Sequence, residues 1–391
     1  MTRAAKDAPV LVAPWRTPIG NAGHGFADLT TTDLAAPVLR ATMRTLREAG
    51  CTAEVDDVVL GNCLGPGGDP ARIASLAAGL GVDVPGVTVD RQCGSGLDAV
   101  MQAAARVKSG DEQLILAGGV ESASTAPWRF WPPSRSSEQG RSSEQDSGAE
   151  QVRYTRAPFA PRGFPDPDMG VAADDLARVR GISRERQDAY ASHSHMAAAA
   201  TDFTGEIVSV AGIERDQRIR PNMSEVRLAR LRPTFTADGT VTAGNSCGIS
   251  DGAAVVAVTT AARAEGLPAL RVLGSAVAGS DPALPGLGPV PAIEKVLARN
   301  GVALSDIGIV EITEAFASVV LAVSDELGLD ESVLCPQGGA IAMGHPWGAS
   351  GAILLVRLAR QMSIPSGPEL GLAACAIGGG QGIAMIVERV Q

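Results

Sequence analysis

Residues 87–117, with the sequence VTVDRQCGSGLDAVMQAAARVKSGDEQLILA, decide the fold class of this chain of 391 residues. Residues 87–90 are strand-like, residues 96–108 have helical periodicity that ends before Gly110, and residues 113–117 form a second apolar run. A strand, a helix and a strand in this order are typical of parallel pairing in an α/β fold. The segment therefore predicts a βαβ unit with Cys93 between its first strand and its helix.

The same alternation of elements occurs at both ends of the chain. In the first third, strands are expected at 9–13 and 58–60, and helices at 32–49 and 70–80. In the last third, strands are expected at 253–258, 269–277, 307–312, 370–377 and 382–387, and helices at 291–299, 314–327 and 349–361. Two similar series of elements indicate an internal duplication, so the fold class is α/β with two related halves.

A region of different composition separates the halves. We expect an N-terminal half at 1–120 with part of 240–260, an inserted loop domain at 121–250, and a C-terminal half at 260–391. The insert contains the sequence RSSEQ at 135–139 and again at 141–145, which is typical of a solvated loop, and a helix is expected at 183–200. Aromatic residues gather between Trp128 and Phe164, either as a small satellite core or as a wall of the substrate site.

Composition excludes several classes of protein. Hydrophobic residues make up 45% of the chain, which excludes wholesale disorder, and a net charge of −10 argues against nucleic-acid binding. We also expect no membrane span and no secretory signal, hence a cytoplasmic protein. Six scattered cysteines without a CxxC pair, and four histidines without ligand spacing, predict neither a disulfide framework nor a metal site.

Three sites have the residue types that acyl-transfer chemistry needs. Cys93 precedes a helix, whose free N–H groups and dipole are expected to favour the thiolate, although such a cysteine is also compatible with simple packing. His345 lies in a glycine-dense loop at 338–351, where it could polarise a thioester carbonyl or take a proton from a thiol. The glycines from Gly378 follow a strand and could expose backbone N–H groups as an oxyanion hole.

Together and in this order, the three sites closely resemble the thiolase superfamily, of the acetyl-CoA C-acyltransferase or 3-ketoacyl-CoA thiolase type, from about residue 9 to residue 390. Further motifs carry the resemblance: RTPIG at 16–20, GGVES at 118–122, LRPTF at 231–235, DGTVTAGN at 238–245 and GPVPA at 288–292. The resemblance implies a duplicated αβαβα five-layer sandwich with an inserted loop domain, assembled as a homodimer or homotetramer. It implies a coenzyme A thioester as substrate and no tightly bound cofactor.

The resemblance also implies roles for individual residues. Cys93 matches the nucleophile that takes the acyl group, and His345 matches the histidine that activates it and helps to bind the thioester oxygen. The N–H groups of Cys93 and Gly378 match the hole that holds the acyl carbonyl. The loop domain matches the part that binds coenzyme A, with Arg220 near the nucleotide.

Departures from the family pattern concern the second half of the reaction. Thr313 replaces the asparagine of the Asn-Glu-Ala-Phe motif, which keeps Phe316. Ala376 stands where the family has a second, acid/base cysteine, and Cys375 comes one residue earlier. Since adjacent strand residues face opposite ways, we expect Cys375 to be a core side chain unless a bulge reorients it. The substrate-facing positions also differ. Asp168 and Met169 stand in place of the family's His-Met, Cys247 in place of a serine, and Pro285 in place of a methionine.

The leading hypothesis is an acyl-CoA acyltransferase that works through an acyl-Cys93 thioester and forms or cleaves a 3-ketoacyl-CoA, in lipid or specialised metabolism. One alternative is a specialised acyltransferase that passes the acyl group to another acceptor without Claisen chemistry. Another is a non-catalytic, thiolase-like subunit that binds coenzyme A. Detection of an acyl adduct by intact mass separates the last alternative from the first two.

Overall fold

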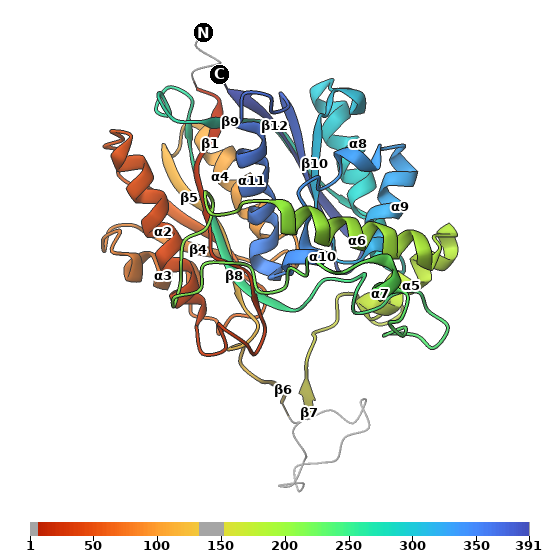
Figure 1. The fold of residues 1–391 in the computed structure, drawn as a ribbon. Coiled ribbons are helices and arrows are strands. Elements are labelled where there is room, and N and C mark those ends of the chain that lie inside the picture. Colours follow the sequence, from red (N-terminus) through yellow and green to blue (C-terminus); the bar gives the residue numbers. More distant parts are fainter. Residues whose placement is uncertain (1–6, 133–151, 391) are drawn as a thin grey trace, which may run out of the picture.

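The computed structural model describes residues 7–132 and 152–390 of the chain (Figure 1). One large sheet has the strand order β10-β11-β12-β9-β1-β8-β5-β3-β4, and β2 pairs with β8. Its strands are β1 (Pro9–Arg16), β2 (Gly20–Asn21), β3 (Asp57–Gly61), β4 (Gly86–Val89), β5 (Leu114–Ser122), β8 (Ser250–Thr260), β9 (Ala269–Gly279), β10 (Ile309–Ile312), β11 (Leu370–Ile377) and β12 (Gln381–Val390). The expected strands are all present, with ends displaced by a few residues.

The sheet consists of two halves that meet along β1 and β9. Only two residue pairs join these strands, Val10 with Arg271 and Leu11 with Leu270. Within the halves, β3 pairs in parallel with β4 and β5, and β10 pairs in parallel with β11, as the βαβ pattern predicts. The two halves are therefore two sheets that are joined only by the short pairing of β1 with β9.

Helices complete five layers, which confirms the predicted α/β sandwich. The helices α2 (Thr31–Glu48) and α3 (Pro70–Ala78) cover the outer face of the first half, and α8 (Pro289–Asn300) and α9 (Ala317–Leu327) cover that of the second. Between the halves lie α4 (Ser95–Ser109) and α11 (Trp347–Met362), which share one apolar cluster with strands of both sheets. The N-termini of these two central helices position Cys93 and His345.

The region expected as an insert contains α5 (Met169–Arg180), α6 (Arg184–Ala200), α7 (Glu225–Leu228) and a short ribbon of β6 (Arg129–Trp131) and β7 (Val152–Tyr154). This ribbon extends away from the two halves (Figure 1). Trp128, Phe130, Trp131 and Phe164 are exposed, so these aromatics do not form the satellite core that was one of the two interpretations. The repeated RSSEQ sequence lies outside the described residues.

One helix begins later than predicted. The helix expected at 314–327 begins only at Ala317, because Glu314 is occupied elsewhere. Its buried carboxylate accepts hydrogen bonds from the Tyr190 hydroxyl at 2.9 Å, the Ser194 hydroxyl at 2.8 Å and the Ile341 N–H at 3.0 Å. These bonds connect α6, the start of α9 and α10 (Ala340–Met343), which precedes the His345 loop.

Candidate active site

Cys93 lies in a tight turn between β4 and α4. Gln92 has a φ of 47°, and Gly94 forms the N-cap of α4. The Ser95 hydroxyl accepts a hydrogen bond from the Arg91 N–H at 2.8 Å and donates one to the Gln92 carbonyl at 2.6 Å. A Cβ at Gly94 would lie 2.6 Å from Cδ1 of Ile377, so a larger residue at this position would have to displace the Ile377 side chain. The turn therefore fixes Cys93 against the end of β11.

The environment of Cys93 keeps its sulfur protonated. Burial raises the pKa of the Cys93 thiol well above its usual value, and the neighbouring Cys375 and Cys247 raise this pKa further through Coulombic repulsion. The expectation that the helix N-terminus favours the thiolate is thus wrong for this site, because desolvation outweighs the dipole. Cys93 needs a base before it can act as a nucleophile.

His345 is held as such a base. Its Nδ1 lies 2.5 Å from the Ser350 Oγ, and this hydroxyl donates a hydrogen bond to the Pro346 carbonyl at 3.1 Å. Ser350 therefore accepts from an N–H at Nδ1, which leaves Nε2 unprotonated. Nε2 is buried without a hydrogen-bond partner among the described residues, and burial lowers the pKa of His345 to about 4.

Close glycine contacts bring the two central helices together beside Cys93 and His345. A Cβ at Gly96 would lie 2.8 Å from the Gly348 carbonyl oxygen, and a Cβ at Gly119 would lie 1.9 Å from it. The buried Glu121 carboxylate accepts hydrogen bonds from the N–H groups of Gly348 at 3.0 Å and Cys63 at 3.1 Å. The start of α11 is thus packed closely against α4 and β5, and Glu121 connects it to the Cys63 loop.

Gly378 lies at the end of β11, where the predicted hole for the acyl oxygen is expected. The turn continues through Gly379 and Gly380, whose φ angles are 83° and 76°. A Cβ at Gly378 would lie 2.5 Å from Cε2 of Phe159. Phe159 belongs to the aromatic segment, so one of these aromatics packs against the glycine turn, in keeping with the interpretation as a site wall.

Cys375 is fully buried on a regular strand, on the same face as Ile377, and it lies near enough to Cys93 to raise the pKa of that thiol. The pairing of β11 with β12 runs from Leu370 opposite Glu388 to Ile377 opposite Gln381 without a register shift, so no bulge reorients Cys375. Its side chain is fully buried, and its Sγ lies 3.0 Å from the Thr313 Oγ1. Burial raises the pKa of Cys375 to about 12. Ala376 faces the opposite side of β11 and is partly exposed.

The other residues expected at the substrate have different environments. Cys247 is half-buried between Ser246, which pairs with Phe316, and Gly248, whose carbonyl accepts from the His345 N–H at 3.1 Å. Phe316 packs edge-on against Phe235. The remaining four have other surroundings: Asp168 caps α5 through the Gly170 N–H at 2.9 Å, Met169 begins that helix, Pro285 is buried in a 3₁₀ turn, and Arg220 is exposed.

Sequence reasoning assigned no role to Ser350, Glu121 or Glu311. Ser350 lies in the first turn of α11, five residues after His345, which is not the three- or four-residue spacing of helical neighbours, so no sequence signal pointed to its contact with the imidazole. Glu121 follows an apolar run and Glu311 interrupts one, and a carboxylate in such a buried strand is itself a signal of polar function.

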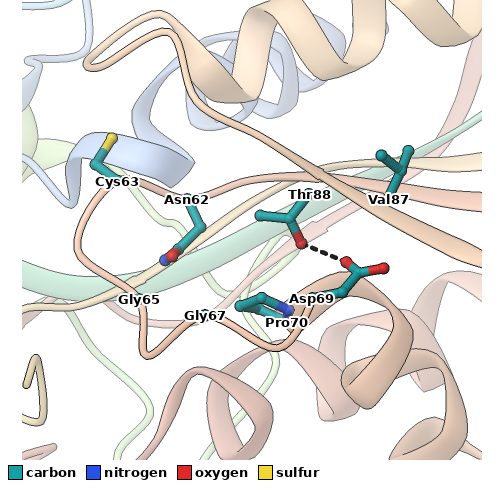
Figure 2. Close-up of a pocket in the computed structure, with 8 residues that line it drawn as sticks. All are labelled: Asn62, Cys63, Gly65, Gly67, Asp69, Pro70, Val87 and Thr88. Atoms are coloured by element: carbon teal, nitrogen blue, oxygen red, sulfur yellow. Dashed lines mark hydrogen bonds between the residues drawn. The ribbon is translucent and has the colours of Figure 1, made fainter.

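A surface pocket of about 400 Å³ is lined by the Cys63 loop, the start of α3 and β4 (Figure 2). Its lining includes Asn62, Asp69 and Thr88, and the Thr88 hydroxyl donates to Asp69 at 2.6 Å. Neither Cys93 nor His345 lines it, so this pocket is separate from the acyl-transfer residues.

Within residues 7–132 and 152–390, no helix is long and apolar enough to cross a membrane. In the same part of the chain, no three His, Cys, Asp or Glu side chains are grouped as metal ligands.

Comparison with known proteins follows the same two halves. The family model for the thiolase N-terminal domain matches residues 9–262, and that for the thiolase C-terminal domain matches residues 267–389. The chain is 42% identical to the acetyl-CoA acetyltransferase of Escherichia coli (strain K12), over 97% of this chain and 99% of that protein. It is 40% identical to a probable acetyl-CoA acyltransferase of Staphylococcus aureus (strain COL), over 97% and 98%. The crystal structure of the Bacillus anthracis acetyl-CoA acetyltransferase matches with a TM-score of 0.86 at 34% identity, covering 99% of this chain and 100% of that one.

Proposed function

Because this chain belongs to the thiolase family and is a thiolase-type acyl-CoA acyltransferase, we propose that Cys93 accepts the acyl group and that His345 is its base. The observation that carries this proposal is the free Nε2 of His345, which Ser350 keeps in the basic tautomer. The Cys93 proton moves to Nε2 while its electron pair stays on sulfur. The sulfur attacks the thioester carbonyl, and coenzyme A leaves with the proton from His345.

The N–H groups of Cys93 and Gly378 hold the carbonyl oxygen in this proposal. Two backbone donors aimed at a developing oxyanion stabilise the transition state, and removal of one such donor typically costs about 10²–10³-fold in rate. The glycine turn and the Gly94 contact with Ile377 support the placement of these two residues at the end of one strand. The loop domain, including the exposed Arg220, binds coenzyme A.

The acyl group is an acetyl or a short acyl group, and the reaction forms or cleaves a 3-ketoacyl-CoA. The names of the relatives from Escherichia coli and Bacillus anthracis support acetyl transfer. Phe159 limits the space beside Gly378, which supports a short chain. A panel of acyl-CoA thioesters of increasing length, read as adduct mass on Cys93, tests this assignment. An adduct that forms faster with long chains than with acetyl contradicts it.

The acid/base position of β11 favours slow formation and cleavage of carbon–carbon bonds. It therefore favours the second candidate function, which is acyl transfer to an acceptor that needs no α-proton abstraction. Ala376 has no proton to exchange, and Cys375 is fully buried against Thr313. We therefore expect normal acylation of Cys93 but slow exchange of acetyl-CoA α-protons with D₂O. Fast exchange in the unmodified protein contradicts the second candidate, and Cys247→Ser then tests the half-buried thiol of Cys247 as the base.

We further propose a homodimer that forms through the free edge of β4. This strand ends the sheet order, so one side of its backbone is unpaired. Val87 on β4, Val82 before it, and Ile73 and Leu76 on α3 are exposed apolar side chains beside this edge. Light scattering of the unmodified protein and of Val87→Lys tests the proposal, since the variant is expected to shift toward monomer.

A cytoplasmic location stays a prediction.

A further inference from the structure

A small cavity lies beside Ser350, the residue that hydrogen-bonds His345. Its volume is about 20 Å³, which is enough for one water molecule. Glu311, Thr313, Met343, Ser350, Leu354 and Arg357 belong to its lining. These six side chains are buried, whereas Ala340, which also lines the cavity, is partly exposed.

Two polar atoms at this cavity have no partner among the described protein groups. They are Oε2 of Glu311 and Nε of Arg357. Buried polar atoms are almost always hydrogen-bonded, to protein or to an ordered water. The Ser350 and Thr313 hydroxyls line the same cavity, so a water there has polar groups from both β10 and α11 within its reach.

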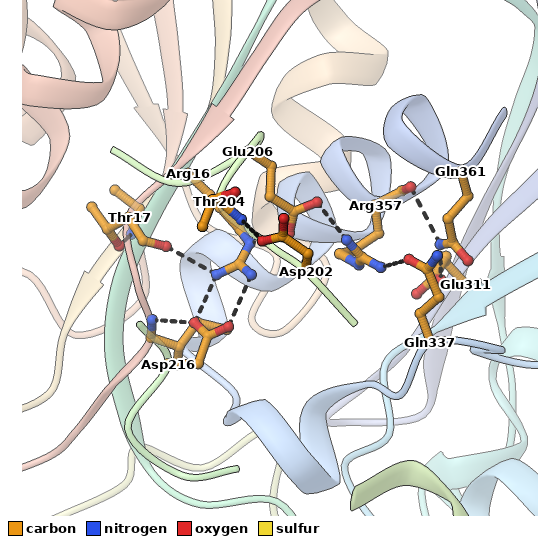
Figure 3. A network of polar contacts seen from close by, with 12 residues as sticks. Arg16, Thr17, Asp202, Thr204, Glu206, Asp216, Glu311, Gln337, Arg357 and Gln361 are labelled. Atoms are coloured by element: carbon orange, nitrogen blue, oxygen red, sulfur yellow. Dashed lines mark hydrogen bonds and ion pairs between the residues drawn. The ribbon is translucent and has the colours of Figure 1, made fainter. Parts of the chain in front are cut away.

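The polar side chains around the cavity come from one face of β10 and one face of α11. Glu311 and Thr313 are two residues apart at the end of β10, on the face that α11 covers. Ser350 and Arg357 lie two turns apart on α11, and Gln361 follows one turn later. The Gln361 amide donates to Glu311 Oε1 at 2.6 Å, and Figure 3 shows this pair beside Arg357.

We propose that the cavity holds one water molecule between Glu311 and Ser350, and that ionised Glu311 acts through it as a positioning residue that stabilises protonated His345. This inference rests on the proposed role of His345 as the base. When the Cys93 proton moves to Nε2, the buried imidazole becomes a cation, and Nδ1–H continues to donate to Ser350. The Ser350 hydroxyl then turns to the water, which donates to Oε2 of Glu311. Only the Cys93 proton changes its atom.

The charges around Glu311 allow it to ionise near neutral pH. Burial raises the pKa of Glu311 to about 7, against the opposing effects of Arg357 and the Gln361 hydrogen bond. Glu314 and Glu206 face it as like charges, and Cys335 and Tyr190 are titratable neighbours that stay protonated because burial raises the pKa of each. Arg357 is shared with Glu206 and Gln337, so it does not neutralise Glu311 alone.

The pKa of Glu311 sets the direction of the pH dependence. Glu311 is neutral below about pH 7 and ionised above it, so its stabilisation of the His345 cation is present on the alkaline side and is lost as the pH falls. Acylation of Cys93 is therefore expected to rise with a midpoint near this pKa. Direct ionisation of the Cys93 thiol gives a separate rise at much higher pH, because burial raises the pKa of Cys93 well above its usual value.

The test is the single-turnover rate of Cys93 acylation by acetyl-CoA, followed by intact mass from about pH 5.5 to about pH 9. Glu311→Gln is expected to remove the rise near neutral pH and to lower the rate on its alkaline side about tenfold, with little change on the acid side. Glu311→Asp, which keeps a carboxyl, is expected to restore a rise with a shifted midpoint. Glu369→Gln, at an exposed carboxylate before β11, is the matched control and is expected to keep the profile of the unmodified protein.

Infrared spectroscopy of the resting protein gives a second readout that does not depend on activity. The band of a protonated carboxyl is expected to disappear with a midpoint near pH 7 in the unmodified protein and to be missing in Glu311→Gln. An unchanged pH profile in folded Glu311→Gln overturns the inference while the acylation of Cys93 stands. A complete lack of acylation in the unmodified protein overturns the proposed function instead.

Discussion

Replacement of Ser350 by alanine tests whether the hydrogen bond to His345 Nδ1 supports this histidine as the base. In Ser350→Ala, an N–H at Nδ1 loses its acceptor 2.5 Å away and has no other partner among the described residues. Nε2 also lacks a partner among these residues, so neither tautomer is then favoured by a hydrogen bond. The imidazolium that forms when His345 accepts the Cys93 proton is left with an unsatisfied buried donor, which costs about 1–3 kcal/mol. Acylation is thus expected to slow about 5- to 150-fold.

The assay is the single-turnover acylation rate of Cys93 by acetyl-CoA, which is expected to fall by the same factor. Ser363→Ala is the matched control, because Ser363 donates to the Ala359 carbonyl near the end of the same helix and is far along the chain from His345. Its acylation rate is expected to stay within about twofold of the unmodified protein. Thermal unfolding verifies that both variants are folded. A Ser350→Ala rate within twofold of the unmodified protein refutes this role of the hydrogen bond.

Three further predictions concern stability, packing and the second thiol. Burial lowers the pKa of His345 from 6.5 to about 4, so the unfolded chain binds this proton at a higher pH than the folded protein does. The free energy of unfolding is therefore expected to fall by about 3 kcal/mol as the pH falls between these two values. In urea titrations, His345→Gln is expected to lose less stability over this range than the unmodified protein, and equal losses contradict the prediction. Gly119→Ala is expected to abolish soluble folded protein or acylation, because its Cβ would lie 1.9 Å from the Gly348 oxygen; circular dichroism and adduct mass check this, and a folded, fully active variant disproves the contact. Cys375→Ala is expected to change Cys93 acylation and α-proton exchange by less than about threefold, since Cys375 is a core side chain; a hundredfold loss of exchange alone would restore it as an acid/base.

The layers of the fold could be predicted from the sequence because each element carries its own periodicity. Residues 87–117 specify a strand, a helix and a strand by local pattern, and the structure places β4, α4 and β5 there. The start of α9 could not be read in this way. Glu314 has helical propensity, but its carboxylate is held by Tyr190, Ser194 and Ile341, which are distant in the sequence. Tertiary hydrogen bonds thus override local preference at this point.

The chemistry of the candidate site was only partly predictable for a similar reason. Cys93 and His345 stand out locally, because each lies among glycines before a helix. The protonation of Cys93 is set by burial and by Cys375 and Cys247, which come from two other parts of the chain. Desolvation depends on the assembled layers, so the helix dipole alone gave the wrong direction. Glu311 stands out in the sequence only as a carboxylate within an apolar run, and the groups that it faces become visible only where α11 covers β10.

Peptide mapping of the acylated protein tests the central claim most directly. The protein is mixed with acetyl-CoA, quenched in acid, digested, and analysed by tandem mass spectrometry for the residue that carries the acetyl group. The acetyl group is expected on Cys93, and His345→Ala is expected to slow its appearance by orders of magnitude without moving it. An acetyl group on Cys63, Cys247 or Cys375, or its complete lack in the unmodified protein, would contradict the account.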